Sequence, residues 1–179
     1  MKTTQILIAG FGGQGVLFAG KFLAYKGLVQ DKQVSWLPSY GPEMRGGTAN
    51  CNVILSDDPV GSPIITTPDV LIAMNLPSLQ KYVDSVAKGG QIYIDSSHIN
   101  AKVERDDVEV FYVPATQMAK DEGIASLANM IMVGSLLENN PELSFDGVVE
   151  VVNNLVPPKK AALKELNMKA LQLGKDYKN

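Results

Sequence analysis

Residues 6–15 read Ile-Leu-Ile-Ala-Gly-Phe-Gly-Gly-Gln-Gly, a short apolar run followed at once by a glycine-rich turn. The run is typical of a buried strand, and the residues after the turn have the spacing of a helix that packs on a sheet. Glycines allow main-chain N–H groups to approach an anion closely, and the following helix adds unpaired donors and the positive end of its dipole. The stretch therefore predicts an anion-holding turn whose residues face a ligand or a partner's active site, namely Gly12, Gly13, Gln14 and Gly15.

A second glycine-rich block follows the next predicted strand, at residues 39–47. This position would return the block to the same end of the sheet as the first turn. A guanidinium held in such a loop binds a carboxylate or phosphate through two parallel hydrogen bonds. A surface ion pair between Arg45 and Glu43 is the alternative, but the glycines on both sides favour an ordered loop. We expect the same site to be faced by Tyr40, Glu43, Arg45, Gly46 and Gly47.

Strand-like and helix-like segments alternate along most of the chain. Strands are predicted at residues 5–9, 33–37, 48–55, 70–74, 91–94 and 108–113. Helices are predicted after residue 15, from residue 75 to the glycines at 89–90, at 115–121, 125–138 and 145–156, and after residue 158. The 125–138 helix has almost no polar face, so it must be covered on several sides.

This alternation predicts a single α/β domain over residues 1–179. We expect a Rossmann-like three-layer fold with a mostly parallel sheet and helices on both faces. Ligands on such sheets gather at the carboxyl ends of the strands, where both glycine-rich blocks are predicted to lie.

Composition excludes several classes of function. A net charge of -3 leaves no basic stripe of the kind that nucleic acid or an anionic membrane requires. The single cysteine, Cys51, excludes an internal disulfide and cannot supply the ligands of an iron–sulfur cluster or a cysteine-based zinc site. No secretory signal or membrane-spanning run is visible, so we expect a cytoplasmic protein without a metal site of its own.

Two other interpretations of the first turn remain open. A dinucleotide-binding turn requires an acidic residue at the end of the second strand, whereas this strand ends in Trp36-Leu37-Pro38-Ser39. Glycines that only allow a strand and a helix to pack closely, with no ligand, are the second interpretation. We expect no catalytic residue in the chain: Cys51 is predicted to be a core residue, and His98 a surface loop residue.

The two glycine-rich blocks are followed by Pro68-Asp69-Val70-Leu71 and by Ala128-Asn129-Met130. With these motifs in this order, the chain resembles the gamma subunit of 2-oxoacid:ferredoxin oxidoreductases. The resemblance covers most of the chain, and the first two blocks are its specific part. It is greatest to the 2-oxoglutarate and 2-oxoisovalerate types, and the pyruvate enzymes share the same plan.

The resemblance implies a multi-subunit enzyme that decarboxylates a 2-oxoacid on thiamine diphosphate. Electrons then pass through iron–sulfur clusters to ferredoxin, and the acyl group passes to coenzyme A. The chain has no Gly-Asp-Gly segment for the magnesium of thiamine diphosphate and no set of cysteines, so these cofactors are expected in partner subunits.

The partners implied are alpha and beta subunits, with a ferredoxin-like delta subunit in some enzymes. In this hypothesis the two blocks of this chain face the shared active site and contact coenzyme A. The alternative is a freestanding nucleotide-binding or regulatory module, which would purify without larger subunits.

Overall fold

The computed structural model describes residues 2–39 and 48–179. In chain order the strands are β1 (Thr3–Phe11), β2 (Gln33–Ser39), β3 (Thr48–Ser56), β4 (Val70–Ala73), β5 (Gln91–Asp95) and β6 (Glu109–Val113). The α-helices are α1 (Val16–Val29), α2 (Leu76–Tyr82), α3 (Ala115–Asp121), α4 (Ala128–Asn139), α5 (Val148–Leu155) and α6 (Ala161–Asp176). Short 3-10 helices are η2 (Val83–Ser85), η3 (Ala125–Leu127) and η4 (Pro158–Lys160).

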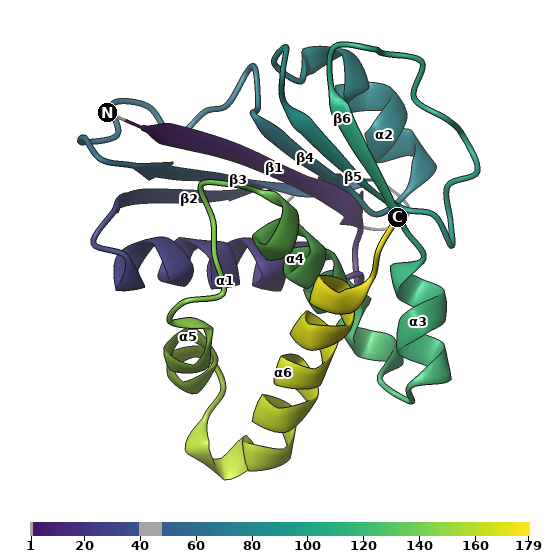
Figure 1. Cartoon of the computed structure of the whole chain (residues 1–179). Coiled ribbons are helices and arrows are strands. Elements are labelled where there is room, and N and C mark those ends of the chain that lie inside the picture. The colour runs from purple at the N-terminus through teal and green to yellow at the C-terminus, as the bar shows by residue number, and fades with distance from the viewer. Residues whose placement is uncertain (1, 40–47) are drawn as a thin grey trace.

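The strands form one six-stranded sheet in the order β2-β3-β1-β4-β5-β6 (Figure 1). Strands β1, β4, β5 and β6 pair in parallel, and only β3 runs against its neighbours, β1 and β2. The mostly parallel sheet is therefore confirmed. The reversal at β3 follows from chain length, because a parallel crossover needs about a dozen residues or more and only residues 40–47 join β2 to β3.

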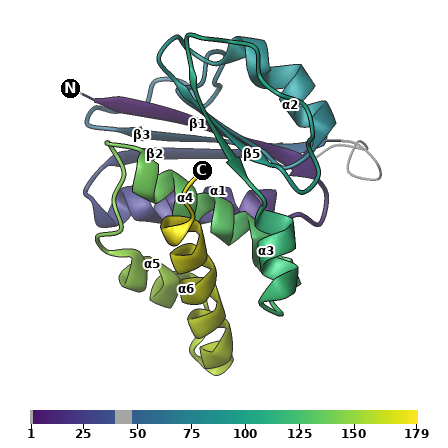
Figure 2. The same ribbon diagram turned by 45° about the vertical axis from the view of Figure 1, so that its right-hand side comes forward.

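Helices cover both faces of the sheet, which confirms the three-layer expectation (Figure 2). On one face α1 packs on β1, β2 and β3, and α4 lies beside it. Helices α5 and α6 pack outside this layer, and α2 covers the opposite face over β1 and β4. The helices are thus unequally distributed, and one face carries a second helical layer.

Helix α4 is buried on all sides, as its apolar sequence predicts, with residues 128–137 all in the interior. It crosses α6 at two glycines whose missing side chains allow main-chain contact. A Cβ atom at Gly134 would lie 2.8 Å from the carbonyl carbon of Leu171, and one at Gly174 would lie 2.8 Å from the nitrogen of Ser135. The crossing fixes α4 between the sheet and α6.

Two of the differences from the predicted element boundaries have an identifiable cause. Strand β1 runs from Thr3 to Phe11, longer at both ends, because it pairs with β3 along its whole length. Helix α2 ends at Tyr82 instead of continuing to residue 88. The guanidinium of Arg105 donates from Nη1 to the carbonyl oxygens of Val83 and Val86, both at 2.8 Å, so these carbonyls need no helical partners.

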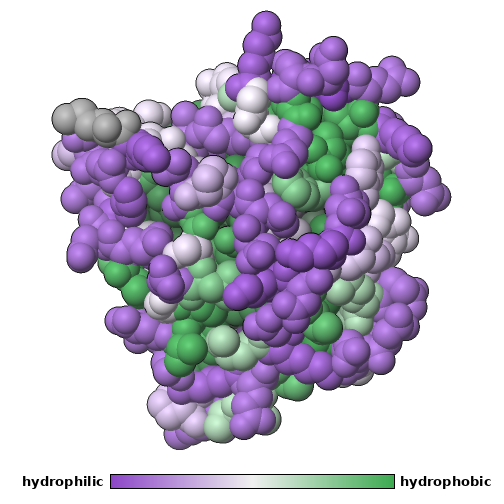
Figure 3. Space-filling model, in the orientation of Figure 1, coloured by the Kyte–Doolittle hydropathy of each residue, from purple (hydrophilic) through white to green (hydrophobic). Residues whose placement is uncertain are grey.

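The surface is mostly hydrophilic on the face shown in Figure 3, with hydrophobic side chains visible in the region of α2 and β6 and also lower down, over the helical layer that contains α1 and α5. The exposed large hydrophobic residues come from several elements, among them Leu28, Ile64 and Val149. Of the helices in the described part of the chain, none has both the length and the apolar character needed to cross a membrane.

Candidate functional site

The first glycine turn connects the carboxyl end of β1 to the start of α1. Gly13 and Gly15 have φ angles of 89° and 74°, in the left-handed region that favours glycine. The main-chain N–H of Gln14 donates to the carbonyl of Phe11 at 3.3 Å and closes the turn. The left-handed backbone conformation at these two positions thus explains why the sequence has glycine there.

The side chain of Gln14 braces this turn. Its Oε1 atom accepts from the N–H of Phe11 at 2.7 Å, and its Nε2 atom donates to the carbonyl of Met74 at 3.0 Å. A Cβ atom at Gly10 would lie 2.6 Å from Oε1 of Gln14 and 2.8 Å from Cβ of Met74. The absence of a side chain at Gly10 therefore leaves room for the Gln14 amide. Gln14, predicted to face a ligand, uses both polar atoms of its amide inside the protein.

Main-chain donors remain at the turn. Among the described residues, the N–H groups of Gly12, Gly13 and Gly15 have no main-chain partner. Helix α1 has no side-chain cap and no acidic residue in its first turn, so the positive end of its dipole is not offset there. This combination suits an anion better than a neutral ligand.

Tyr40, Glu43, Arg45, Gly46 and Gly47 lie outside the described residues. The strands on either side nevertheless show where the block is attached. Thr48 pairs with Phe11, and Ser39 pairs with Asn50, which in turn pairs with Ala9. Both attachment points therefore lie at the carboxyl edge of β1, where the glycine turn begins.

Two asparagines at this edge carry buried polar atoms and were not predicted as site residues. Asn75 caps α2, accepting from the N–H of Ser78 at 2.8 Å, while its own Nδ2 has no partner among the described residues. Asn129, in the first turn of α4, donates from Nδ2 to the carbonyl of Gly15 at 3.0 Å. Its Oδ1 is likewise buried and, within the described chain, unpartnered. Asn129 appears in the sequence motif Ala128-Asn129-Met130, but nothing local predicts its contact with the turn.

Exposed apolar side chains border the same edge. Phe11 is 41% exposed at the end of β1, Leu37 is 39% exposed near the end of β2, and Leu76 is 36% exposed at the start of α2. An apolar rim around a polar turn is typical of a surface that another protein covers.

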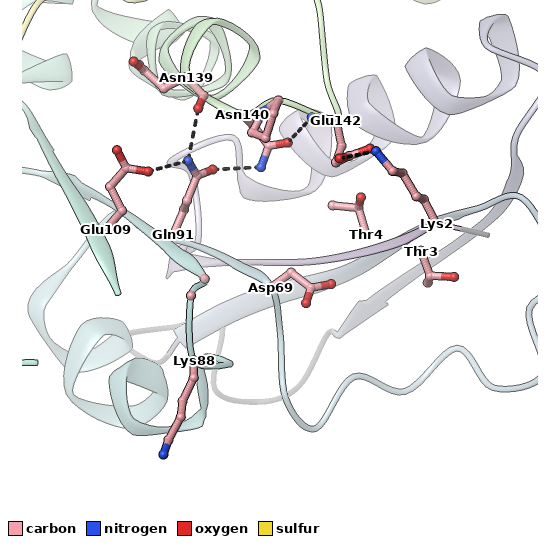
Figure 4. A pocket seen from close by; sticks show the side chains of 13 residues that line it. Lys2, Thr3, Thr4, Asp69, Lys88, Gln91, Glu109, Asn139, Asn140 and Glu142 are labelled. Atoms are coloured by element: carbon pink, nitrogen blue, oxygen red, sulfur yellow. Dashed lines mark hydrogen bonds and ion pairs between the residues drawn. The ribbon is translucent and has the colours of Figure 1, made fainter. Parts of the chain in front are cut away.

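A polar cavity of about 540 Å³ lies at the opposite edge of the sheet (Figure 4). Its main polar groups bond to one another: Gln91 donates from Nε2 to Glu109 at 2.9 Å, and Asn140 donates to Oε1 of Gln91 at 2.8 Å. Lys2 forms an ion pair with Glu142 at 2.8 Å across the cavity. Because these polar groups form their hydrogen bonds and ion pair with one another, we interpret the cavity as a structural contact between the starts of the strands and the end of α4.

The family described as pyruvate ferredoxin/flavodoxin oxidoreductase matches residues 5–177. The chain belongs to this family. Within the oxidoreductase family it aligns with chains of two lengths. The 2-oxoglutarate synthase subunit KorC of Methanothermobacter marburgensis is 36% identical, over 96% of this chain and 95% of that protein. The ketoisovalerate oxidoreductase subunit VorA of Methanothermobacter thermautotrophicus is 46% identical, over 74% of this chain but only 28% of that protein. The matched region thus spans only 28% and 37% of the length of the two VorA relatives.

Solved structures of the oxidoreductase family share the fold. The gamma subunit of a keto/oxoacid ferredoxin oxidoreductase from Geobacter sulfurreducens has a TM-score of 0.81, 30% identity, and coverage of 97% of this chain and 96% of that chain. The 2-oxoglutarate:ferredoxin oxidoreductase from Magnetococcus marinus has a TM-score of 0.85 and 25% identity, covering 98% of this chain and 31% of that chain. The latter structure holds 2-oxoglutarate, coenzyme A and succinyl-CoA. The predicted resemblance to gamma subunits is confirmed.

The sheet order disfavours the dinucleotide interpretation of the glycine turn. This agrees with membership in the oxidoreductase family. A dinucleotide fold places the second strand, with its acidic residue, next to the first. Here the antiparallel strand β3 separates β1 from β2, and β2 ends at Ser39. Among the described residues, the ribose-binding carboxylate therefore has no equivalent position.

The remaining candidate chemical groups are in the environments that the sequence predicts. Cys51 is fully buried on β3, where burial raises the pKa of its thiol to about 12, so it is not a nucleophile at neutral pH. His98 is an exposed residue in the turn after β5.

Proposed function

We propose that the chain is the gamma subunit of a 2-oxoacid:ferredoxin oxidoreductase that converts a 2-oxoacid to an acyl-CoA. Thiamine diphosphate, magnesium and iron–sulfur clusters belong to the alpha and beta subunits, and to a delta subunit where one exists. Ferredoxin accepts the electrons, so the complex works in the cytoplasm. Support comes from the KorC relative, a chain of nearly the same length, and from the single cysteine, which is buried in the core.

The glycine turn indicates which residues of this chain would bind coenzyme A. We assign the N–H groups of Gly12, Gly13 and Gly15 and the guanidinium of Arg45 to the phosphates of coenzyme A. Main-chain donors at an uncapped helix start and an arginine are the groups that bind phosphate best in proteins. The Magnetococcus marinus relative, which holds coenzyme A and succinyl-CoA, supports this choice of ligand. Phe11, Leu37 and Leu76 then contact the larger subunits around the turn.

Arg45→Ala in the assembled complex is expected to raise the KM for coenzyme A about tenfold, since a charge-assisted hydrogen bond contributes roughly 1.5–3 kcal/mol. The KM for the 2-oxoacid should stay unchanged. Steady-state kinetics with coenzyme A as the varied substrate measures both values. Lys159→Ala, which removes one positive charge from an exposed position in η4, is the matched control. An unchanged KM for coenzyme A and an unchanged turnover in Arg45→Ala would exclude the assignment.

The purified chain alone is expected to reduce no ferredoxin with any 2-oxoacid, because its cofactors lie in other subunits. Native mass spectrometry of the complex from its source should show larger subunits bound to the chain together with their cofactors. Ferredoxin reduction by the isolated chain, or a monomer that retains adenine nucleotide and has no larger partner, would contradict the subunit role.

A further inference from the structure

Asn129 and Gly15 fit each other closely although they lie 114 residues apart. Asn129 is 4% exposed, and its Nδ2 donates to the Gly15 carbonyl at 3.0 Å. A Cβ atom at Gly15 would lie 2.7 Å from Cγ of Asn129. The asparagine side chain therefore occupies the space that any side chain at position 15 would need.

Asn129 is itself held firmly in place. It lies in the first turn of α4, a helix buried on all sides and fixed against α6 at Gly134 and Gly174. A hydrogen bond from such a position orients its acceptor more strictly than one from a surface loop. The acceptor, the carbonyl of Gly15, also receives the first helical bond of α1, from the N–H of Ala19 at 3.0 Å.

The Gly15 carbonyl shares one peptide plane with the N–H of Val16. In a trans peptide the C=O and N–H bonds point in opposite directions, so fixing the carbonyl on Asn129 also fixes the direction of the Val16 N–H. Among the described residues that N–H has no main-chain partner, as expected of the first donor at a helix start. The side chain of Asn129 thus sets the orientation of a donor that it does not touch.

We propose that Asn129 is a positioning residue for the glycine turn, holding the Gly15–Val16 peptide so that the Val16 N–H points toward the ligand beside the donors of Gly12, Gly13 and Gly15. This inference rests on the proposed function, in which the turn binds the phosphates of coenzyme A. The role differs from that of Gln14, which braces the other half of the turn against Met74, the residue after β4.

Asn129→Asp tests the role in the assembled complex. The variant keeps the shape of the side chain but replaces the Nδ2 donor with a carboxylate oxygen, which repels the Gly15 carbonyl. We expect the KM for coenzyme A to rise about tenfold, the effect of one lost charge-assisted hydrogen bond, with kcat nearly unchanged. We also expect faster hydrogen exchange at residues 12–19, measured by mass spectrometry of the same complex. Asn129→Ala, which removes the donor without adding a charge, should change both quantities in the same direction and to a smaller degree.

Asn167→Asp is the matched control. Asn167 lies in α6 and is also 4% exposed, and its Nδ2 donates to the carbonyl of Leu163 at 2.7 Å. Its Oδ1 is buried and unpartnered among the described residues, as that of Asn129 is. Any general cost of placing a buried carboxylate in a helix therefore appears in both variants. Only the Asn129 variants should change the turn and the KM for coenzyme A.

The two readouts separate the failure of this inference from that of the proposed function. Unchanged exchange at residues 12–19 in both Asn129 variants, or equal effects from Asn167→Asp, overturns the positioning role. Faster exchange at the turn with an unchanged KM for coenzyme A supports the positioning role and overturns the assignment of coenzyme A to this turn.

Discussion

Replacing Gly174 by alanine is expected to lower the free energy of unfolding by about 3 kcal/mol, the upper part of the usual range for overpacked cores. The added Cβ atom would meet the carbonyl oxygen of Ile131 and lie 2.8 Å from the nitrogen of Ser135. Both are main-chain atoms of α4, so no change of rotamer relieves the clash and the two helices must move apart. Urea denaturation of the purified chain, followed by circular dichroism, measures the loss.

A glycine with open space around it provides the control for this variant. No described atom lies within 4 Å of a Cβ atom at Gly61, and its φ angle is not positive. Gly61→Ala should therefore change the stability by less than about 0.5 kcal/mol. Equal stabilities for Gly174→Ala and Gly61→Ala would mean that α4 and α6 do not cross as closely as described.

Replacing Lys26 by methionine is expected to raise the free energy of unfolding by about 1–3 kcal/mol at neutral pH, as when other buried charges give way to apolar side chains of similar size. Lys26 lies on α1 with no exposed surface, and its Nζ atom has no hydrogen-bond partner among the described residues. Burial lowers its pKa, and the negative charge of Asp146 opposes this shift without cancelling it. Methionine keeps the apolar stem and removes the charge.

The pH dependence of stability identifies the cause. The unfolded chain holds the Lys26 proton up to the ordinary pKa of 10.5, whereas the folded chain releases it at lower pH. Between these two values the unfolded state binds more protons, so this group makes stability rise with pH. Below the folded pKa the cost of the buried charge is fully present. Cys51, whose folded pKa is raised, has the opposite effect on stability at the upper end of this range, but equally in both proteins. Denaturation of the two proteins from about pH 7 to 10 should therefore show the wild type gaining stability relative to Lys26→Met as the pH rises.

Lys21→Met, at an exposed position of the same helix, controls for the change in net charge. It should leave both the stability at neutral pH and the slope with pH unchanged. A Lys26→Met protein that is less stable than the wild type, or that keeps the wild-type slope, would show that the lysine is solvated or paired in the folded chain.

Much of the fold could be predicted because its decisive signals are local. The apolar run before Gly10 and the glycines after it define β1, the turn and the start of α1, and the absence of a polar face on α4 predicts its complete burial. The pairing of β3 between β1 and β2 could not be predicted from periodicity, since strand neighbours depend on contacts between distant residues. Its antiparallel direction did have a signal, because the stretch between the two strands is too short for a crossover helix.

The candidate site was predicted less completely, for the same reason. The sequence pattern identifies the glycines and their backbone requirement, which the positive φ angles of Gly13 and Gly15 show. It does not reveal that the Gln14 amide reaches Met74, or that Asn129 reaches Gly15 from a helix 114 residues later. These contacts depend on how α4 and β4 meet the turn, which is a property of the tertiary packing.

The brace formed by Gln14 bears on selectivity among oxoacids. Both polar atoms of its amide hold the turn, one accepting from the Phe11 N–H and one donating to the Met74 carbonyl. The donors of Gly12, Gly13 and Gly15, which have no main-chain partner among the described residues, are main-chain N–H groups. Main-chain donors at a helix start favour negative charge and close approach of an anion. In the proposed function these donors face the phosphates of coenzyme A, which are the same for every acyl product, so the turn itself would carry no preference among 2-oxoacids.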